Sequence, residues 1–310
     1  MTCARPSASG VRFHGQVGPC LGEHGLTDRI AHTQSAGERR LEASAIIKKI
    51  RTSSGITRKE LAQLANVSPS TIGRIERGEM DPTWATMQKI LSASGRQTNG
   101  TSVVSSGDTS AIRAAAPLFT ELFLCAEKAS VRAATAAASA MEAVGDPWAE
   151  RWKRAGWLND SMGLDDLIAI AVSAGIAGTI ARRPATRSSV AIEGGWRTLV
   201  DRLKTSEFDY AVTGFVATRR DRSEQTAGAP YVYVSDPRAA AEPIGLIRAR
   251  AGQGILLLEA ELDDLNQVEV EGGVRFVPKA RALLDAFSGP GRDPDKAEDL
   301  LRTMWEQVFG

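Results

Sequence analysis

A chain of 310 residues has room for about two or three domains, and 43% hydrophobic with 24% charged residues is ordinary for a folded protein in water. A net charge of +1 excludes a protein that selects its partner by overall charge alone. The longest apolar run, residues 167–181, is interrupted by Ser, Gly and Thr and falls short of a bilayer span, and three cysteines give no disulfide framework. We therefore expect a cytoplasmic protein without membrane segments.

Residues 1–37 are rich in Gly, Ser and His and show no hydrophobic periodicity, so we expect a disordered extension. The segment also lacks the apolar core of a signal peptide. It contains all three histidines and two cysteines of the chain, namely His14, His24, His32, Cys3 and Cys20. Their spacing matches no pair of zinc ligands, and we expect no metal site. The rest of the chain lacks histidine, which is the commonest general base.

Residues 57–78 predict two short helices joined by a tight turn. The first begins with a capping box, in which the Thr57 hydroxyl accepts from the Glu60 amide and the Glu60 carboxylate accepts from the Thr57 amide. After a turn at residues 66–67, Ser68 caps the second helix, and Pro69 occupies its first position, where the missing N–H costs nothing. This order of signals is typical of a helix-turn-helix.

The second helix ends at Gly78, a residue suited to a left-handed cap, and is therefore about ten residues long. A helix of that length fits in a major groove of DNA. Ile72 and Ile75 form its buried stripe. Three side chains are left facing outward: Ser70, Thr71 and Arg74.

Flanking helices complete an all-α bundle over residues 38–95. Residues 41–53 carry apolar side chains at helical spacing, and residues 83–94 place Trp84, Met87, Ile90 and Leu91 on one side. Residues 38–95 contain ten Lys or Arg against six Asp or Glu. The attraction to phosphate is therefore modest and local to this segment.

This segment resembles the phage-repressor-like (Xre/Cro) helix-turn-helix domain in the run from Val67 to Gly78 followed by Asp81-Pro-Thr83. The resemblance implies that outward residues of the second helix read base edges and that neighbouring residues hold phosphates. The DNA-binding positions are then Arg58, Ser68, Ser70, Thr71, Arg74 and Arg77.

Among these, Arg58, Ser68 and Arg77 would set the register on the phosphates, and Arg74 would make a bidentate contact to guanine. Pro69 stands where some members carry a base-reading amide, so Arg74 would provide most of the specificity. The alternative is that Arg74 and Arg77 are ordinary solvated charges on a surface helix.

Residues 96–110 are polar and rich in Gly and Ser, which indicates a flexible linker. We expect residues 111–205 to be an Ala-rich helical segment, with Pro117 the single Pro or Gly before residue 145. A helix after Asp146 carries Trp148 and Trp152 at i, i+4, with Trp157 beyond. Such a pair is more often core or a contact with another helix than a ligand cage.

The sequence pattern of residues 206–310 is typical of an α+β domain. Short β-branched and aromatic runs begin at Tyr210, Tyr231, Ile244 and Ile255, and residues 268–277 alternate on both sides of a Gly-Gly turn. Two helices close the chain, over 278–288 and 293–309. The predicted fold class is α+β, with the helix-turn-helix bundle first, the Ala-rich helical middle next and the α+β domain last.

This last domain resembles the C-terminal region of AbiEi-type antitoxins of type IV toxin–antitoxin systems. The shared features are Tyr210-Ala-Val-Thr-Gly214, the strand from Tyr231 to Ser235 with Asp236-Pro237, the Val277-Pro278 helix start, and Gly289-Pro-Gly-Arg292 followed by Ala297-Glu298. The resemblance implies a bacterial regulator that represses its own operon and antagonises a toxin. Those antitoxins usually carry a winged helix directly ahead of this region, whereas here an Xre-type domain and an Ala-rich helical segment precede it.

Two basic motifs have alternative interpretations. Residues 289–292 can cradle a phosphate with Arg292, but a rigid turn before the next helix explains them as well. The run Arg219-Arg220-Asp-Arg222 can touch DNA, although an exposed charge run is usually a solvated turn.

No enzyme signature is present, so we expect neither catalysis nor a cofactor. A self-cleaving repressor places its serine in a Gly-Asp-Ser-Met string, and a nucleotidyltransferase has Gly-Ser with paired aspartates on a strand; both are missing. The pairs Asp165-Asp166 and Asp263-Asp264 point apart in regular structure.

The sequence thus predicts a sequence-specific DNA-binding transcriptional regulator, a repressor that acts as an antitoxin and autoregulates a toxin–antitoxin operon. One recognition helix covers few base pairs, so we expect a homodimer on double-stranded operator DNA at the nucleoid. A cognate toxin is the possible protein partner. The alternative is a protein-interaction module whose main role is toxin neutralisation or ligand sensing, with DNA binding secondary.

Overall fold

The computed structural model describes residues 42–99, 102–128, 146–178, 187–220, 230–250 and 254–310. The chain divides into two compact units, residues 1–39 and residues 40–310, and everything below concerns the second. The predicted disordered extension of residues 1–37 lies outside the described residues.

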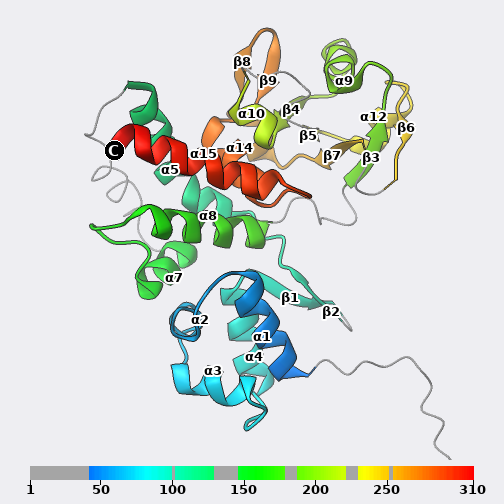
Figure 1. Cartoon of the computed structure of the whole chain (residues 1–310). Helices are drawn as coiled ribbons and strands as arrows, with labels where there is room; N and C mark the ends of the chain where they lie inside the picture. Colours follow the sequence, from blue (N-terminus) through cyan, green and yellow to red (C-terminus); the bar gives the residue numbers. More distant parts are fainter. Residues whose placement is uncertain (1–41, 100–101, 129–145, 179–186, 221–229, 251–253) are drawn as a thin grey trace, which may run out of the picture. The chain divides into compact units, whose positions relative to one another are not determined.

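The predicted helix-turn-helix forms as a bundle of four short helices: α1 (Ala43–Ser53), α2 (Arg58–Ala65), α3 (Pro69–Glu76) and α4 (Trp84–Ala93) (Figure 1). The capping box of α2 is confirmed, because the Glu60 amide donates to the Thr57 hydroxyl and the Thr57 amide donates to the Glu60 carboxylate at 2.7 Å. Asn66 ends α2 in the left-handed conformation, with φ of 53°. Helix α3 has eight residues, two fewer than expected, with Gly78 left-handed just beyond its cap.

Ile47, Leu61, Ile72, Ile75 and Ile90 are fully buried and form the centre of this bundle. The prediction for Trp84 was wrong, since its side chain is 60% exposed. Trp84 is the first residue of α4, a full turn before the first buried side chain of that helix, and therefore lies beyond the edge of the core.

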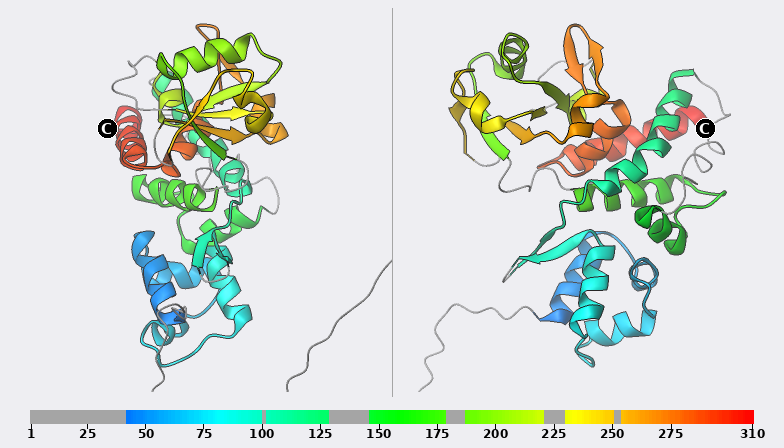
Figure 2. Two further views of the ribbon diagram at one scale, coloured as in Figure 1. Left: turned by 90° about the vertical axis from the view of Figure 1, so that its right-hand side faces the viewer. Right: turned by 180° about the vertical axis from the view of Figure 1, so that it is seen from behind.

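The segment that we expected to be a linker forms an antiparallel hairpin, β1 (Arg96–Asn99) and β2 (Ser102–Ser105), whose strands run side by side (Figure 2). The β-branched residues Thr98, Val103 and Val104 stand on either side of Gly100-Thr101 in the sequence, a hairpin signal that the polar composition concealed. The Arg96 guanidinium donates to the hydroxyls of Ser53 and Ser54 at the end of α1, so the hairpin is fastened to the bundle.

The Ala-rich middle contains α5 (Ser110–Lys128), α7 (Pro147–Ala155) and α8 (Leu164–Gly178). Pro117 lies within α5 without ending it, and residues 129–145 are outside the described residues. Trp148 and Trp152 are almost completely buried with ring centroids 5.9 Å apart, which confirms that they belong to the core.

A seven-stranded sheet dominates the C-terminal part, in the order β6-β3-β7-β5-β4-β9-β8. Its strands are β3 (Arg187–Ala191), β4 (Tyr210–Thr213), β5 (Tyr231–Val234), β6 (Ile247–Arg248), β7 (Ile255–Glu259), β8 (Glu269–Glu271) and β9 (Val274–Phe276). The pairs β4–β9 and β5–β7 are parallel, and the others are antiparallel. Strand β3 lies inside the segment predicted to be helical, because its Arg-Ser-Ser-Val-Ala sequence carries little apolar signal.

The remaining helices are α9 (Gly195–Lys204), α10 (Phe215–Thr218), α12 (Pro237–Ala241), α13 (Leu262–Asn266), α14 (Lys279–Phe287) and α15 (Asp293–Phe309). Helix α14 packs against α5, α8 and α15 as well as against β4. The middle helices and the closing helices therefore share one core, and the expected division at residue 205 does not separate them. The α+β class is confirmed. No helix among the described residues is long and apolar enough to cross a membrane.

Candidate nucleic-acid interface

The amino-terminal end of α3 carries three of the predicted DNA-binding side chains close together. The Ser68 hydroxyl accepts the Thr71 amide at 3.0 Å, and its oxygen lies 2.9 Å from the Ser70 hydroxyl and 2.7 Å from that of Thr71. Pro69 holds the first turn in place without needing a donor. The three hydroxyls are therefore preorganised by the cap, and Ser68 and Ser70 are exposed.

Arg74 projects from the middle of the same helix. The residue is exposed, and its side chain makes no hydrogen bond or ion pair within the described part of the chain. Ile72 and Ile75 anchor the opposite side of the helix in the core, each with no exposed area. A bidentate contact to a base requires a helix with a fixed backbone and a guanidinium that is not already held in an ion pair, and Arg74 on α3 has both.

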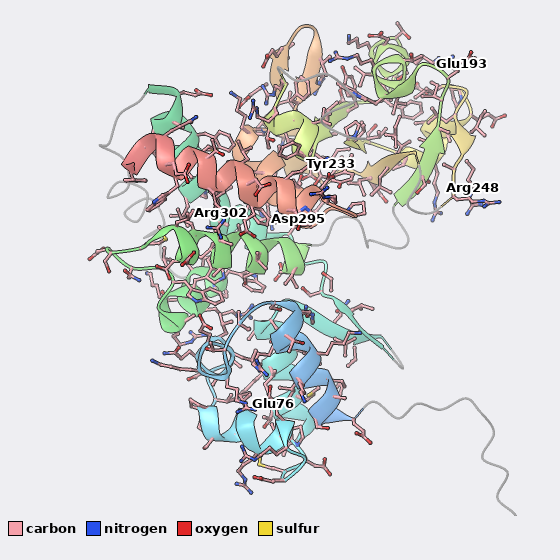
Figure 3. All side chains as sticks on the ribbon, in the orientation of Figure 1. Glu76, Glu193, Tyr233, Arg248, Asp295 and Arg302 are labelled. Atoms are coloured by element: carbon pink, nitrogen blue, oxygen red, sulfur yellow. The ribbon has the colours of Figure 1, made fainter. Side chains whose placement is uncertain are left out.

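Arg58, by contrast, is held by a carboxylate. The side chain of Glu76 at the end of α3 is 2% exposed, and it accepts from the guanidinium of Arg58 and, at 2.7 Å, from that of Arg51 in α1. Burial acts to raise the pKa of Glu76, but the two arginines more than offset it and lower the pKa below its ordinary value. This network ties α1, α2 and α3 together. Figure 3 labels Glu76 within the bundle.

Half of the Arg58 side chain is exposed in spite of this ion pair. Only its Nε is used by Glu76, and its terminal nitrogens have no other partner among the residues that the structure describes. Arg58 can therefore hold a phosphate with the rest of its guanidinium while Glu76 fixes its direction.

Arg77 also forms an ion pair with a carboxylate, and this pair lies at the surface. Its guanidinium makes two parallel hydrogen bonds to Glu79, at 2.5 and 2.9 Å, with both side chains about half exposed. The Arg77 guanidinium lowers the pKa of Glu79 below its ordinary value. A phosphate contact by Arg77 has to compete with this carboxylate.

Sequence reasoning missed Glu76, which organises the arginines. The signal was available, because Glu76 lies four residues after Ile72 and next to Ile75, on the buried stripe of α3. A carboxylate on a buried stripe requires a cation nearby, and the flanking helices supply two.

The two basic motifs of the C-terminal part are structural in the described residues. A side chain at Gly289 would place its Cβ 2.2 Å from the Tyr231 hydroxyl, and Gly291 is left-handed, which favours the rigid turn over a phosphate cradle. The interpretation of Arg220 as a solvated turn residue was wrong. Its side chain is 6% exposed, and its guanidinium bonds to Glu269 and Glu271 and lies 4.5 Å from the centre of the Phe276 ring.

The sheet packs against a buried polar network centred on α14. Asp285 is fully buried on α14 and accepts from the hydroxyls of Thr213 and Tyr233 and from Arg281 at 2.9 Å. Burial raises the pKa of Asp285, although Arg281 partly opposes this. Asp264 pairs with the same arginine at 3.0 Å, so one cation serves two buried carboxylates. All of these groups are closed to solvent or nearly so.

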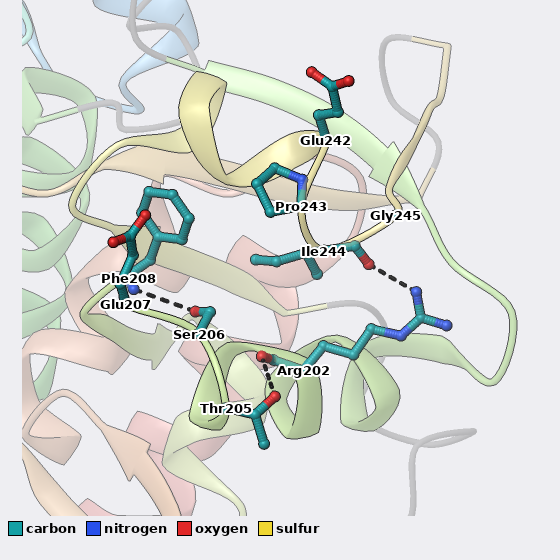
Figure 4. A pocket seen from close by; sticks show the side chains of 9 residues that line it. All are labelled: Arg202, Thr205, Ser206, Glu207, Phe208, Glu242, Pro243, Ile244 and Gly245. Carbon is teal, nitrogen blue, oxygen red and sulfur yellow. Dashed lines mark hydrogen bonds between the residues drawn. The ribbon is translucent and has the colours of Figure 1, made fainter.

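A shallow surface pocket of about 450 Å³ lies where α9 ends near the segment before β6 (Figure 4). Its main polar group is the Arg202 guanidinium, which already donates a hydrogen bond to the Ile244 carbonyl at 2.7 Å. Glu242 points away from Arg202. The pocket thus lacks converging polar groups. The described residues also contain no cluster of three or more potential metal ligands.

Comparison with known proteins agrees with the geometry of the bundle. Residues 47–96 match the family described as Helix-turn-helix. No curated protein and no solved structure matches the chain. The fold of the bundle and this match define the class of the protein, a DNA-binding transcriptional regulator with a helix-turn-helix domain near its amino terminus.

Proposed function

We propose that the chain is a sequence-specific repressor in which α3 enters the major groove of its operator and Arg74 reads a guanine. The single observation that supports this most is the uncommitted Arg74 on a helix whose other side is fixed by Ile72 and Ile75. A bidentate contact of this kind discriminates between bases by about 1 to 3 kcal/mol.

The other residues have graded roles. Ser70 and Thr71 are close enough to the groove to add hydroxyl contacts, and Ser68 and Arg58 hold the phosphates on each side. Arg77 contributes least, because Glu79 occupies the Nε–Nη2 edge of its guanidinium. Six positions of this kind from one bundle give limited affinity, so the repressor binds as a homodimer to two half-sites about one helical turn apart.

We further propose that the regulator is the antitoxin of a toxin–antitoxin pair, works in the bacterial cytoplasm and nucleoid, and represses its own operon. The resemblance of residues 210–298 to AbiEi-type antitoxins supports this role. The chain is not an enzyme in this proposal. A second candidate, a protein-interaction module for which DNA binding is secondary, is favoured by the size of the C-terminal sheet and its helices.

Genetics and footprinting separate these functions. Each open reading frame beside the gene is induced alone in a bacterial host and then together with this chain. We expect one frame to arrest growth and co-expression to restore it. The purified chain should also protect a two-fold symmetric site in its own promoter. Protection without rescue would leave a repressor that is not an antitoxin, and rescue without protection would favour the interaction module.

A further inference from the structure

Helix α7 carries two sets of hydrogen-bond donors that face different partners. Its two buried tryptophans attach it to the helices of the C-terminal part. The Trp148 indole donates to Asp108, which precedes α5, at 2.9 Å, and the Trp152 indole donates to Ser173 of α8 at 3.1 Å. Both indole N–H groups are thus satisfied, as buried indoles usually are. This side of α7 is part of the shared core.

The other side of α7 contacts α2 of the helix-turn-helix, and the two helices pack against each other. The Arg154 guanidinium donates to the carbonyls of Gln63 and Leu64 at 3.4 and 3.3 Å. The indole of Trp157, just beyond α7, donates to Glu60 at 3.1 Å, and Glu60 is the acidic member of the capping box of α2. Arg154 in the last turn of α7 and Trp157 just after it therefore contact the two ends of α2.

Arg151 makes the equivalent contact to α4. Its guanidinium donates to the carbonyl of Ser92 in the last turn of that helix at 3.2 Å. The same guanidinium lies 4.3 Å from the Trp148 ring centre, so the buried tryptophan fixes its position. Arg151 and Arg154 are three residues apart, which places them on one side of α7.

The last carbonyls of a helix have no partner within it, and a cation beside them stabilises the last turn. Helices α2 and α4 have no basic residue of their own in the last turn. Arg154 and Arg151 supply those cations from outside the bundle. Helix α2 packs against α3 and holds it in position, so support for α2 is also support for the helix that enters the groove.

From this geometry we infer that Arg151, Arg154 and Trp157 are positioning residues for DNA binding, although they lie outside the helix-turn-helix segment. The C-terminal part holds α2 and α4 through α7, and the affinity for DNA depends on that contact. The inference rests on DNA binding by α3 and adds that the C-terminal part contributes to it.

The test compares the full chain with Arg154→Ala, Arg154→Lys and Trp157→Phe, and with Lys153→Ala as the matched control. Lys153 is on the same helix and pairs only with Glu150 in the described part of the chain. Two quantities are measured: amide hydrogen exchange in α2 relative to β4 and β5, and affinity for an operator fragment over a range of salt concentrations.

We expect Arg154→Ala to lower the affinity roughly fivefold and to speed exchange in α2 but not in the sheet. Arg154→Lys should restore much of both, Trp157→Phe should show a smaller loss of affinity with faster exchange, and Lys153→Ala should change neither. The slope of log affinity against log salt should stay constant, because Arg154 contacts carbonyls and not phosphates.

Three results would overturn the inference. The first is an affinity and an α2 exchange rate for Arg154→Ala equal to those of Lys153→Ala. The second is a salt slope reduced by about one, which would identify Arg154 as a phosphate contact. The third is a wild-type chain without affinity for DNA, which would end the proposed function as well, whereas exchange in α2 would still show whether the contact to α7 supports that helix.

Discussion

The helix-turn-helix and the C-terminal sheet both contain a buried carboxylate bound by arginine, but the two networks have opposite charge balances. In the bundle, one buried Glu76 serves two arginines, and one of these is half exposed at the surface. In the sheet, one Arg281 serves the two buried carboxylates of Asp264 and Asp285. An excess of cations that reaches the surface is useful for binding phosphates, whereas an excess of buried carboxylates fixes the packing of strands and helices.

The largest effect should come from removing the cation of the sheet network. We expect Arg281→Met to lower the free energy of unfolding by about 3 to 5 kcal/mol, because two carboxylates are left without their buried partner. Urea denaturation measures this. The matched control is Arg302→Met, whose exposed ion pair with Glu298 on α15 should matter little. Equal midpoints for the two variants would mean that the buried network carries no special stability.

A smaller loss is expected when the bundle loses its carboxylate. Glu76→Gln should cost about 1 to 3 kcal/mol, since the arginines it leaves behind can still reach water. Glu79→Gln is the control, because its pair with Arg77 is exposed and should not affect unfolding. If urea denaturation gave Glu76→Gln a cost as large as that of Arg281→Met, the contrast between the networks would be lost.

The cap of α2 provides a local test of the bundle. Thr57→Ala removes the hydroxyl that accepts the Glu60 amide and should cost about 1 kcal/mol. Thr52→Ala is the control, since the Thr52 hydroxyl bonds only to carbonyls one turn back in α1. Thermal unfolding monitored by circular dichroism can distinguish the two, and identical melting temperatures would contradict the role of the capping box.

A fall in pH should lower the stability of the helix-turn-helix bundle and should not lower that of the sheet network. Burial acts to raise the pKa of Glu60, but the bonds from Thr57 and Trp157 outweigh it, and this pKa, like that of Glu76, is lowered. The bundle therefore keeps this stability above about pH 4.5 and loses it as the pH falls through the lower folded values.

The stability that Asp285 contributes depends on pH in the opposite direction. Because burial raises its pKa in the folded state, the folded chain binds the proton more tightly, and the stability that Asp285 contributes rises as the pH falls through that raised value. Protection factors from hydrogen exchange at a series of pH values should decline in α2 and α3 while α14 is maintained or gains. Parallel changes in both regions would show that the carboxylates are not the cause.

The sequence predicted the bundle well because its signals are local. Thr57, Glu60, Ser68 and Pro69 act within four residues of themselves, so the starts of α2 and α3 follow from the sequence alone. In the sheet, strands β4, β5, β7 and the β8–β9 hairpin were predicted from alternation and a Gly-Gly turn. Their order was not predictable, since β4 pairs with β9 between Val212 and Phe276, 64 positions apart, and β5 pairs in parallel with β7.

For the candidate site, the sequence predicted which residues lie on the exposed side of α3. It did not predict which of the arginine side chains form ion pairs within the protein. Arg58, Arg74 and Arg77 are alike in sequence, and only the fold shows that Arg58 and Arg77 form ion pairs with carboxylates whereas Arg74 forms none with the described residues. The contacts from Arg151 and Arg154 were also beyond prediction, because they join residues about 60 to 90 positions apart.

The central claim, that Arg74 reads a base from α3, is tested most directly by a double-mutant cycle between protein and DNA. Wild type and Arg74→Ala are titrated against the footprinted operator and against operators with single base-pair replacements. We predict that Arg74→Ala and the replacement of one guanine each cost about 1 to 3 kcal/mol and that their combination costs no more than either alone. Additive losses at every position of the operator would contradict the account.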